Sequence, residues 1–164
     1  MHELKPLSRD AVPRALERAE RYRLLNEPGE AESICLDILA VQPEHAEARV
    51  HLILAMSDQL DEKIGRFEDA MVVVGQLTGY ERSYYEGIVC ERRAKAHHRG
   101  GGHLAGNIAH DWFRRAMACF EAAAAVRPAG NEDALLRWNT CARALMRHAE
   151  LVPRVEERSE PVLE

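Results

Sequence analysis

The sequence predicts an all-α protein, and three observations support this class. The chain has 164 residues, of which 46% are hydrophobic and only 5% aromatic, a composition typical of helical proteins. Apolar residues recur three or four positions apart along most of the chain, which is the spacing of one face of a helix. The β-branched run at 72–74 lies inside such a pattern and does not indicate a strand. A chain of this length can bury roughly 70% of its unfolded surface as one domain.

Seven helices follow from this spacing, and the turn signals between them set their ends. In chain order they cover about 10–26, 28–41, 44–62, 66–78, 81–98, 107–126 and 131–149. Pro43 and Pro128 end the second and sixth helices, since proline cannot continue a helix. The stretch "RGGGHLAG" reverses the chain after the fifth helix. We expect Asn107 to cap the sixth helix, and Asn131 or Gly130 to cap the seventh.

Three segments of the chain are similar to one another. They are "PGEAESICLDIL", "FEDAMVVVGQL" and "FRRAMACFEAAAA", and each places an alanine (Ala31, Ala70 or Ala116) three positions after its start. An apolar stripe at helical spacing follows each alanine. In the first and third segments a proline lies 12 residues beyond the alanine. The sequence therefore contains a divergent internal repeat.

These segments resemble the tetratricopeptide repeat family, whose units of about 34 residues form two antiparallel helices with small residues at their crossing. "YRLLNEPGEAESICLDILAVQP" carries Tyr22, Ala31 and Pro43 at the family's offsets, and "YYEG" is similar to the start of a first helix. The likeness spans roughly residues 12–147. It implies a helical-hairpin superhelix of about three pairs with a C-terminal closing helix.

The spacing departs from that family. The alanines lie 39 and then 46 residues apart, and the larger insertion falls between Gly87 and Ala116. We therefore expect the fifth helix to be overlong. The predicted organisation is a tail at 1–9, a helical domain at 10–149 and a disordered acidic tail at 150–164, because "VPRVEERSEPVLE" is charged and proline-containing and has little to bury.

The net charge of −5 is unevenly distributed. Residues 1–80 carry 9 basic and 15 acidic groups, whereas residues 81–115 carry 7 basic and 4 acidic groups. The acidic remainder argues against nucleic acid as a main partner. The basic region around the fifth helix instead favours an acidic segment of a protein.

Composition also bears on the compartment. No stretch reaches the roughly 20 apolar residues of a membrane span, and "MHELKPLSRD" lacks the apolar core of a signal peptide. The four cysteines form no CxxC pair, so we expect them to be reduced core residues: Cys35, Cys90, Cys119 and Cys141. These features predict a cytoplasmic protein without a cofactor or a membrane partner.

The resemblance implies a concave groove lined by the first helix of each pair. Carried onto this sequence, the groove positions are Tyr84, Ile88, Glu91, Arg92, Asn139 and Arg143. An aromatic residue, an amide and arginines suit contact with a protein or peptide. The expected function is a non-catalytic adaptor or scaffold whose partner is another protein or a second copy of this chain.

A metal-dependent helical enzyme or sensor is the alternative. Its ligands would come from the histidine-rich insertion: His97, His98, His103 and His110. Their spacing fits poorly, because adjacent histidines point about 100° apart on a helix and no HExxH pair is present. The glycine run also lacks the GxxxxGK[ST] order of a phosphate loop, and no set of residues for acid–base catalysis is evident.

Overall fold

The computed structural model describes residues 2–61 and 66–154, and within these ranges the protein is all-helical with no strand. Seven α-helices and one short 3-10 helix follow in order: η1 (Arg9–Ala11), α1 (Val12–Leu24), α2 (Pro28–Val41), α3 (Ala46–Asp58), α4 (Arg66–Val74), α5 (Gly79–Gly100), α6 (Ala105–Ala125) and α7 (Asp133–Arg147). The predicted fold class and all seven predicted helices are confirmed. None of the helices in the described part is long and apolar enough to cross a bilayer.

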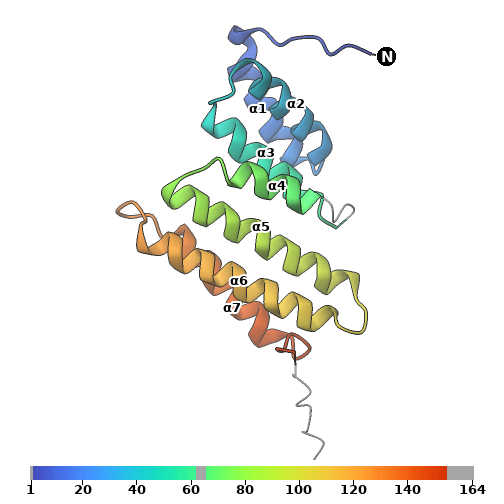
Figure 1. Cartoon of the computed structure of the whole chain (residues 1–164), viewed down its shortest axis with the longest axis vertical. Coiled ribbons are helices and arrows are strands. Elements are labelled where there is room, and N and C mark those ends of the chain that lie inside the picture. Colours follow the sequence, from blue (N-terminus) through green and yellow to red (C-terminus); the bar gives the residue numbers. More distant parts are fainter. Residues whose placement is uncertain (1, 62–65, 155–164) are drawn as a thin grey trace, which may run out of the picture.

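Consecutive helices pack against each other as hairpins, and the hairpins stack along the long axis of the molecule. Figure 1 shows α1 and α2 at one end, α3 and α4 next, and α6 and α7 at the other end, with α5 crossing the middle. The α5–α6 hairpin is the longest, with helices of 22 and 21 residues. The expectation that the insertion lengthens the fifth helix is confirmed.

The interior contains two main apolar clusters, one on each side of α5. The first is formed by α1 to α4, with Val89 of α5, and the second by α5, α6 and α7. Tyr85 and Trp112 pack against both clusters. Burial of these faces, rather than intrinsic helix propensity, stabilises helices of this length.

Small residues lie where neighbouring helices come closest. Ala31, Ala70 and Ala116 are fully buried, as the repeat predicts. Gly87 of α5 faces the ring of Phe120 of α6, so that this crossing has no space for a side chain at position 87. The three alanines predicted for the helix crossings are therefore core residues.

The turns confirm some of the predicted caps and correct one. After α5 the chain reverses at Gly101 and Gly102, whose φ angles of 68° and 111° favour glycine. The Asn131 side-chain oxygen accepts a bond of 3.0 Å from the Asp133 amide at the start of α7. The prediction for Asn107 was wrong. Helix α6 begins earlier, at Ala105, and the Asn107 side chain donates instead to the carbonyl of Val152 at 3.0 Å.

The chain after α7 packs back onto α6. Leu151 is buried in the second cluster, and a Cβ at Gly106 would collide with the carbonyl oxygen of Glu150. Ordered packing therefore extends beyond the boundary predicted at 149. Of the predicted tail, residues 155–164 lie outside the described part of the chain.

Candidate binding groove

Helix α5 presents a stripe of cationic side chains between α3 and α7. Arg92, Lys95 and Arg99 are spaced three and four residues apart, so they lie on one face of the helix. Together with α3, the residues after it and α7, this stripe encloses a polar hollow of about 280 Å³. We call it the basic groove, and its lining residues are Ser57, Asp58, Leu60, Asp61, Arg92, Lys95, Arg99 and Arg137.

The Arg92 side chain links α5 to α3 and, through Asp58, to α1. Its guanidinium lies 2.8 Å from Asp58 and donates to the Leu54 carbonyl at 2.9 Å and to the Ser57 hydroxyl. The other oxygen of Asp58 accepts a bond of 2.9 Å from Arg23 of α1. Burial lowers the pKa of Arg92, while the nearby Asp58 carboxylate opposes this shift. Because the unperturbed value lies far above neutral pH, Arg92 stays charged.

Glu91 lies buried below the groove and pairs with two of its cations. Its side chain is 1% exposed and pairs with Lys95 of α5 and, at 3.4 Å, with Arg137 of α7. A carboxylate this buried is tolerated only when it is paired. Glu91 therefore fixes the two cations whose outer ends face the solvent.

The groove has an excess of positive charge. Four of its lining residues are basic and two are acidic, and the buried Glu91 adds a third carboxylate beneath them, which leaves an excess of one positive charge. Arg99 pairs with Asp61, but 59% of its side chain remains exposed, and Arg137 is 38% exposed. Within residues 2–61 and 66–154, each of these two arginines pairs with one carboxylate, Asp61 or Glu91, whereas a guanidinium carries five N–H donors.

Only one of the six residues predicted for the groove, Arg92, lines it. Ile88 is 2% exposed and belongs to the second core cluster, so its placement on the groove surface was wrong. Glu91 is also buried and acts through Lys95 and Arg137 rather than through direct contact. The physical reason is the packing around this part of α5: Glu91 contacts Arg137 of α7, and Ile88 belongs to the apolar cluster formed by α5, α6 and α7.

The remaining predicted residues lie outside the groove. Tyr84 stacks on Tyr80 with ring centroids 5.4 Å apart and contacts Phe120, so it is part of an aromatic cluster at the other end of α5. Asn139 is half-buried on α7, and Arg143 is exposed there. Within the described residues Arg143 makes no ion pair. The structure does not bring these three residues together with Arg92.

The histidines of the insertion do not converge either. His97 lines a separate hollow beside Arg93, His103 is exposed in the turn after α5, and His110 contacts Asp111 on α6. Burial, followed by the charge of Arg93, lowers the pKa of His97. The four-histidine grouping is thus not assembled, although His98 has close partners elsewhere in the chain.

Part of the basic groove could have been predicted from the sequence, but the groove positions were taken from the tetratricopeptide pattern instead. The spacing of Arg92, Lys95 and Arg99 on one helix is visible without a structure. Asp58 and Arg137, which line the groove with them, are 34 or more positions away and could be found only from the stacking of the helices. Residues after α3 also contribute, and nothing in their local sequence marks them.

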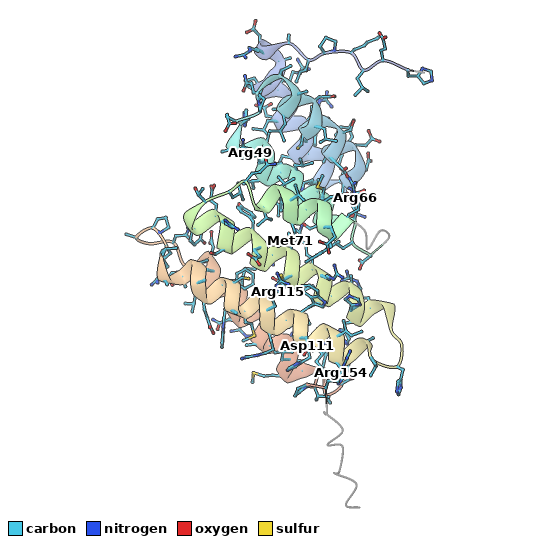
Figure 2. The ribbon with its side chains drawn as sticks, viewed as in Figure 1. Arg49, Arg66, Met71, Asp111, Arg115 and Arg154 are labelled. Carbon is cyan, nitrogen blue, oxygen red and sulfur yellow. The ribbon has the colours of Figure 1, made fainter. Side chains whose placement is uncertain are left out.

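A further shallow hollow lies along α6. Figure 2 shows Asp111 and Arg115 one helical turn apart, with Arg154 below them. Ile108 and Trp112 complete its lining, and its volume is about 320 Å³. Arg115 is already paired with Glu86 of α5 at 3.3 Å and lies over the Trp112 ring. The main role of Arg115 in this hollow is therefore to link α6 to α5.

Comparison of the chain with protein-family models, with curated proteins and with solved structures found no match.

Proposed function

We propose that the protein is a non-catalytic adaptor of the tetratricopeptide kind that binds an acidic segment of another protein in the basic groove. The observation that carries this proposal is the groove itself, where four cationic side chains meet three carboxylates, Asp58, Asp61 and the buried Glu91, between α3, α5 and α7. An acidic segment would pair with Arg99 and Arg137, which are the two most exposed cations of the groove.

The size of the groove favours a crossing segment over an enclosed small ligand. The hollow has about 280 Å³, at the lower end of the roughly 300–1,000 Å³ of small-molecule sites, but it is open to solvent, whereas such sites bury most of their ligand. A volume of this size accommodates one or two side chains of a longer segment. The remainder of that segment would run along the helix surface.

The cations are preorganised, which lowers the cost of binding. Arg92 is held by Asp58 and Ser57, and Lys95 and Arg137 by the buried Glu91. Side chains already fixed in place lose less rotamer entropy when a partner arrives. The local positive charge also speeds the encounter with an acidic segment.

A second copy of the chain is an alternative source of that segment. The first 80 residues have an excess of six acidic groups over basic ones, the difference between 15 and 9. Head-to-tail pairing of this half with the groove of another copy would show as a mass that rises with concentration in light scattering. A monomeric mass at all concentrations leaves a different protein as the partner.

The direct test uses a fluorescein-labelled peptide of ten alternating glutamates and alanines, with binding followed by fluorescence anisotropy. We expect saturable binding that weakens as salt rises from about 0.1 M to 0.5 M, because screening shortens the range of exposed charges. The double variant Arg99→Glu with Arg137→Gln should abolish it. Glutamine at 137 retains a donor towards Glu91, which limits damage to the fold.

The matched control is Arg114→Glu with Arg147→Gln, which changes the net charge equally at two exposed positions on α6 and α7. This control should bind the peptide as the unmodified protein does. Equal loss in both double variants would show that only the overall charge matters. Unchanged binding by the groove variant, confirmed folded by circular dichroism, would refute the groove as the binding site.

A further inference from the structure

Two histidines and a glutamate from distant parts of the chain meet at the end of the α5–α6 hairpin. His98 comes from the last turn of α5, and His148 and Glu150 from the turn after α7. One ligand atom from each lies within 4.8 Å of the other two. The Nε2 atom of His98 is 2.7 Å from Oε1 of Glu150, and the Nδ1 atom of His148 is 3.4 Å from the same oxygen.

The turn that carries His148 and Glu150 is fixed by its own contacts. Leu151 anchors it in the second core cluster, and the Leu151 amide donates to the His148 carbonyl at 3.0 Å. The absence of a side chain at Gly106 lets the Glu150 carbonyl approach the backbone of α6. Asn107 holds the following residues by donating to the Val152 carbonyl.

We propose that His98, His148 and Glu150 form a binding site for a divalent first-row transition-metal ion, with Zn²⁺ as the best fit. Two imidazole nitrogens and one carboxylate oxygen are ligands that zinc shares with cobalt and nickel, whereas calcium and magnesium prefer oxygen ligands alone. Three protein ligands leave at least one coordination position for water or for a group supplied from outside.

Two of the three distances between ligand atoms are close to those that coordination requires, and the third, between the two imidazole nitrogens, is at most 4.8 Å. Ligand atoms about 2.0–2.1 Å from a tetrahedral metal lie roughly 3.3 Å from each other. The His148–Glu150 separation of 3.4 Å already matches this. The His98–Glu150 pair must open by about half an ångström as the metal replaces the proton between them. The side chains are partly exposed, with 25%, 46% and 56% of their surfaces accessible for His98, His148 and Glu150, so an ion can reach them and small adjustments are possible.

This site is independent of the adaptor proposal. Its ligands do not line the basic groove, and none of them is substituted in the peptide-binding variants. Loss of either activity would therefore leave the other intact. Of the four histidines in the insertion, only His98 takes part, and its partners are about 50 residues further along the chain.

The test is a titration of untagged protein with Zn²⁺ by isothermal calorimetry, with Co²⁺ absorption spectra as a second readout. We expect one equivalent to bind, and visible Co²⁺ bands typical of a four- or five-coordinate site. His98→Gln, His148→Gln and Glu150→Gln should each weaken zinc binding at least about tenfold. His103→Gln and His110→Gln are the matched controls and should bind within twofold of the unmodified protein.

Two further measurements keep the result unambiguous. Gly106→Ala retains all three ligands but displaces the turn, so zinc affinity should fall by roughly tenfold. Ca²⁺ and Mg²⁺ at equal concentration should produce no heat above dilution. The proposal is overturned if no zinc binds, if His148→Gln binds as tightly as the unmodified protein, or if the His103→Gln control loses binding.

Discussion

A Cβ atom on Gly87 would lie 2.6 Å from Cε1 and 2.7 Å from Cδ1 of the Phe120 ring. The ring is fully buried, so it has no space into which it can retreat. We expect Gly87→Ala to lower the free energy of unfolding by about 1–3 kcal/mol, which outweighs the gain of up to ~1 kcal/mol that alanine brings to a helix. Urea denaturation followed by circular dichroism measures the change.

Gly29 provides the control for this substitution, since it lies in the first turn of α2 and no atom would meet its Cβ within 4 Å. Gly29→Ala should be neutral or stabilising. Adding Phe120→Leu to Gly87→Ala should cost less than the same change in the unmodified protein, because the two residues share one space. Equal stability of the Gly87→Ala and Gly29→Ala proteins would contradict the close crossing.

Arg92 and Arg143 should differ sharply in their effect on stability. Arg92→Met removes one of the two cationic partners of Asp58 and the donor to Ser57 and to the Leu54 carbonyl, at a side chain that is only 22% exposed. Hydrogen bonds that involve a charged group contribute about 1.5–3 kcal/mol, so we expect a loss of about 2–3 kcal/mol. Arg143→Met, at an exposed position, should stay within about 0.5 kcal/mol. Thermal or urea unfolding of both variants distinguishes the two, and equal effects would refute the network described for Arg92.

His51 of α3 should make the protein sensitive to mild acid. Burial, followed by the charge of Arg23, lowers its pKa below the ordinary 6.5, while Glu20 and Glu47 act in the opposite direction. The unfolded chain therefore binds the proton more readily than the folded protein. The stability that neutral His51 provides is complete above about pH 6.5 and is lost as the pH falls from there through the lowered folded pKa.

The measurement compares urea unfolding at pH 7.5 and pH 5.0. His51→Gln should reduce the loss of stability between the two values, whereas His103→Gln, at an exposed turn position, should leave it unchanged. Identical pH dependence in the His51→Gln protein would show that this imidazole does not contribute.

The four thiols should differ widely in reactivity. Burial raises the pKa of Cys35 and of Cys141 to about 12. Cys90 and Cys119 interact across the α5–α6 interface, where their hydrogen bond raises the pKa of Cys90 and lowers that of Cys119. Because the thiolate is the reactive form and Cys119 is only half-buried, iodoacetamide at pH 8 should label Cys119 first. Peptide mass spectrometry of the native protein reads this out, with the urea-unfolded protein as control. Faster labelling of Cys90 would contradict the lowered pKa of Cys119 and the raised pKa of Cys90.

The sequence predicted the helices well because their signals are local. Apolar spacing indicates the seven helices, and Pro43 and Pro128 mark the ends of two of them, without knowledge of distant contacts. Asn107 was misplaced because a capping preference cannot reveal that its amide binds the carbonyl of Val152, 45 residues away. The hydrogen bond to Val152, formed in the tertiary structure, therefore outweighs the local preference of asparagine for a helix N-terminus.

The two candidate sites were less accessible from the sequence for the same reason. Ile88 was assigned to the groove surface, yet it is buried in the apolar cluster formed by α5, α6 and α7. The cationic stripe of the groove was visible on α5, but its partners on α3 and α7 were not. His148 and Glu150 lie at the end of the last predicted helix and in the predicted tail, where no periodic pattern indicates a fixed turn.

Trp112, which packs against both core clusters, also gives the protein an intrinsic optical reporter at its midpoint. Its indole meets the Phe67 ring edge-on at 5.0 Å, and the Arg93 guanidinium lies over both rings. Phe67 is on α4, Arg93 on α5 and Trp112 on α6. Any separation of the N-terminal hairpins from the C-terminal ones changes the polarity around this indole. The other tryptophan, Trp138, bonds Glu121 within the C-terminal half. In the Trp138→Phe protein, Trp112 is the remaining tryptophan. Its fluorescence would therefore report in real time, without an attached dye, when the contact between α4, α5 and α6 loosens.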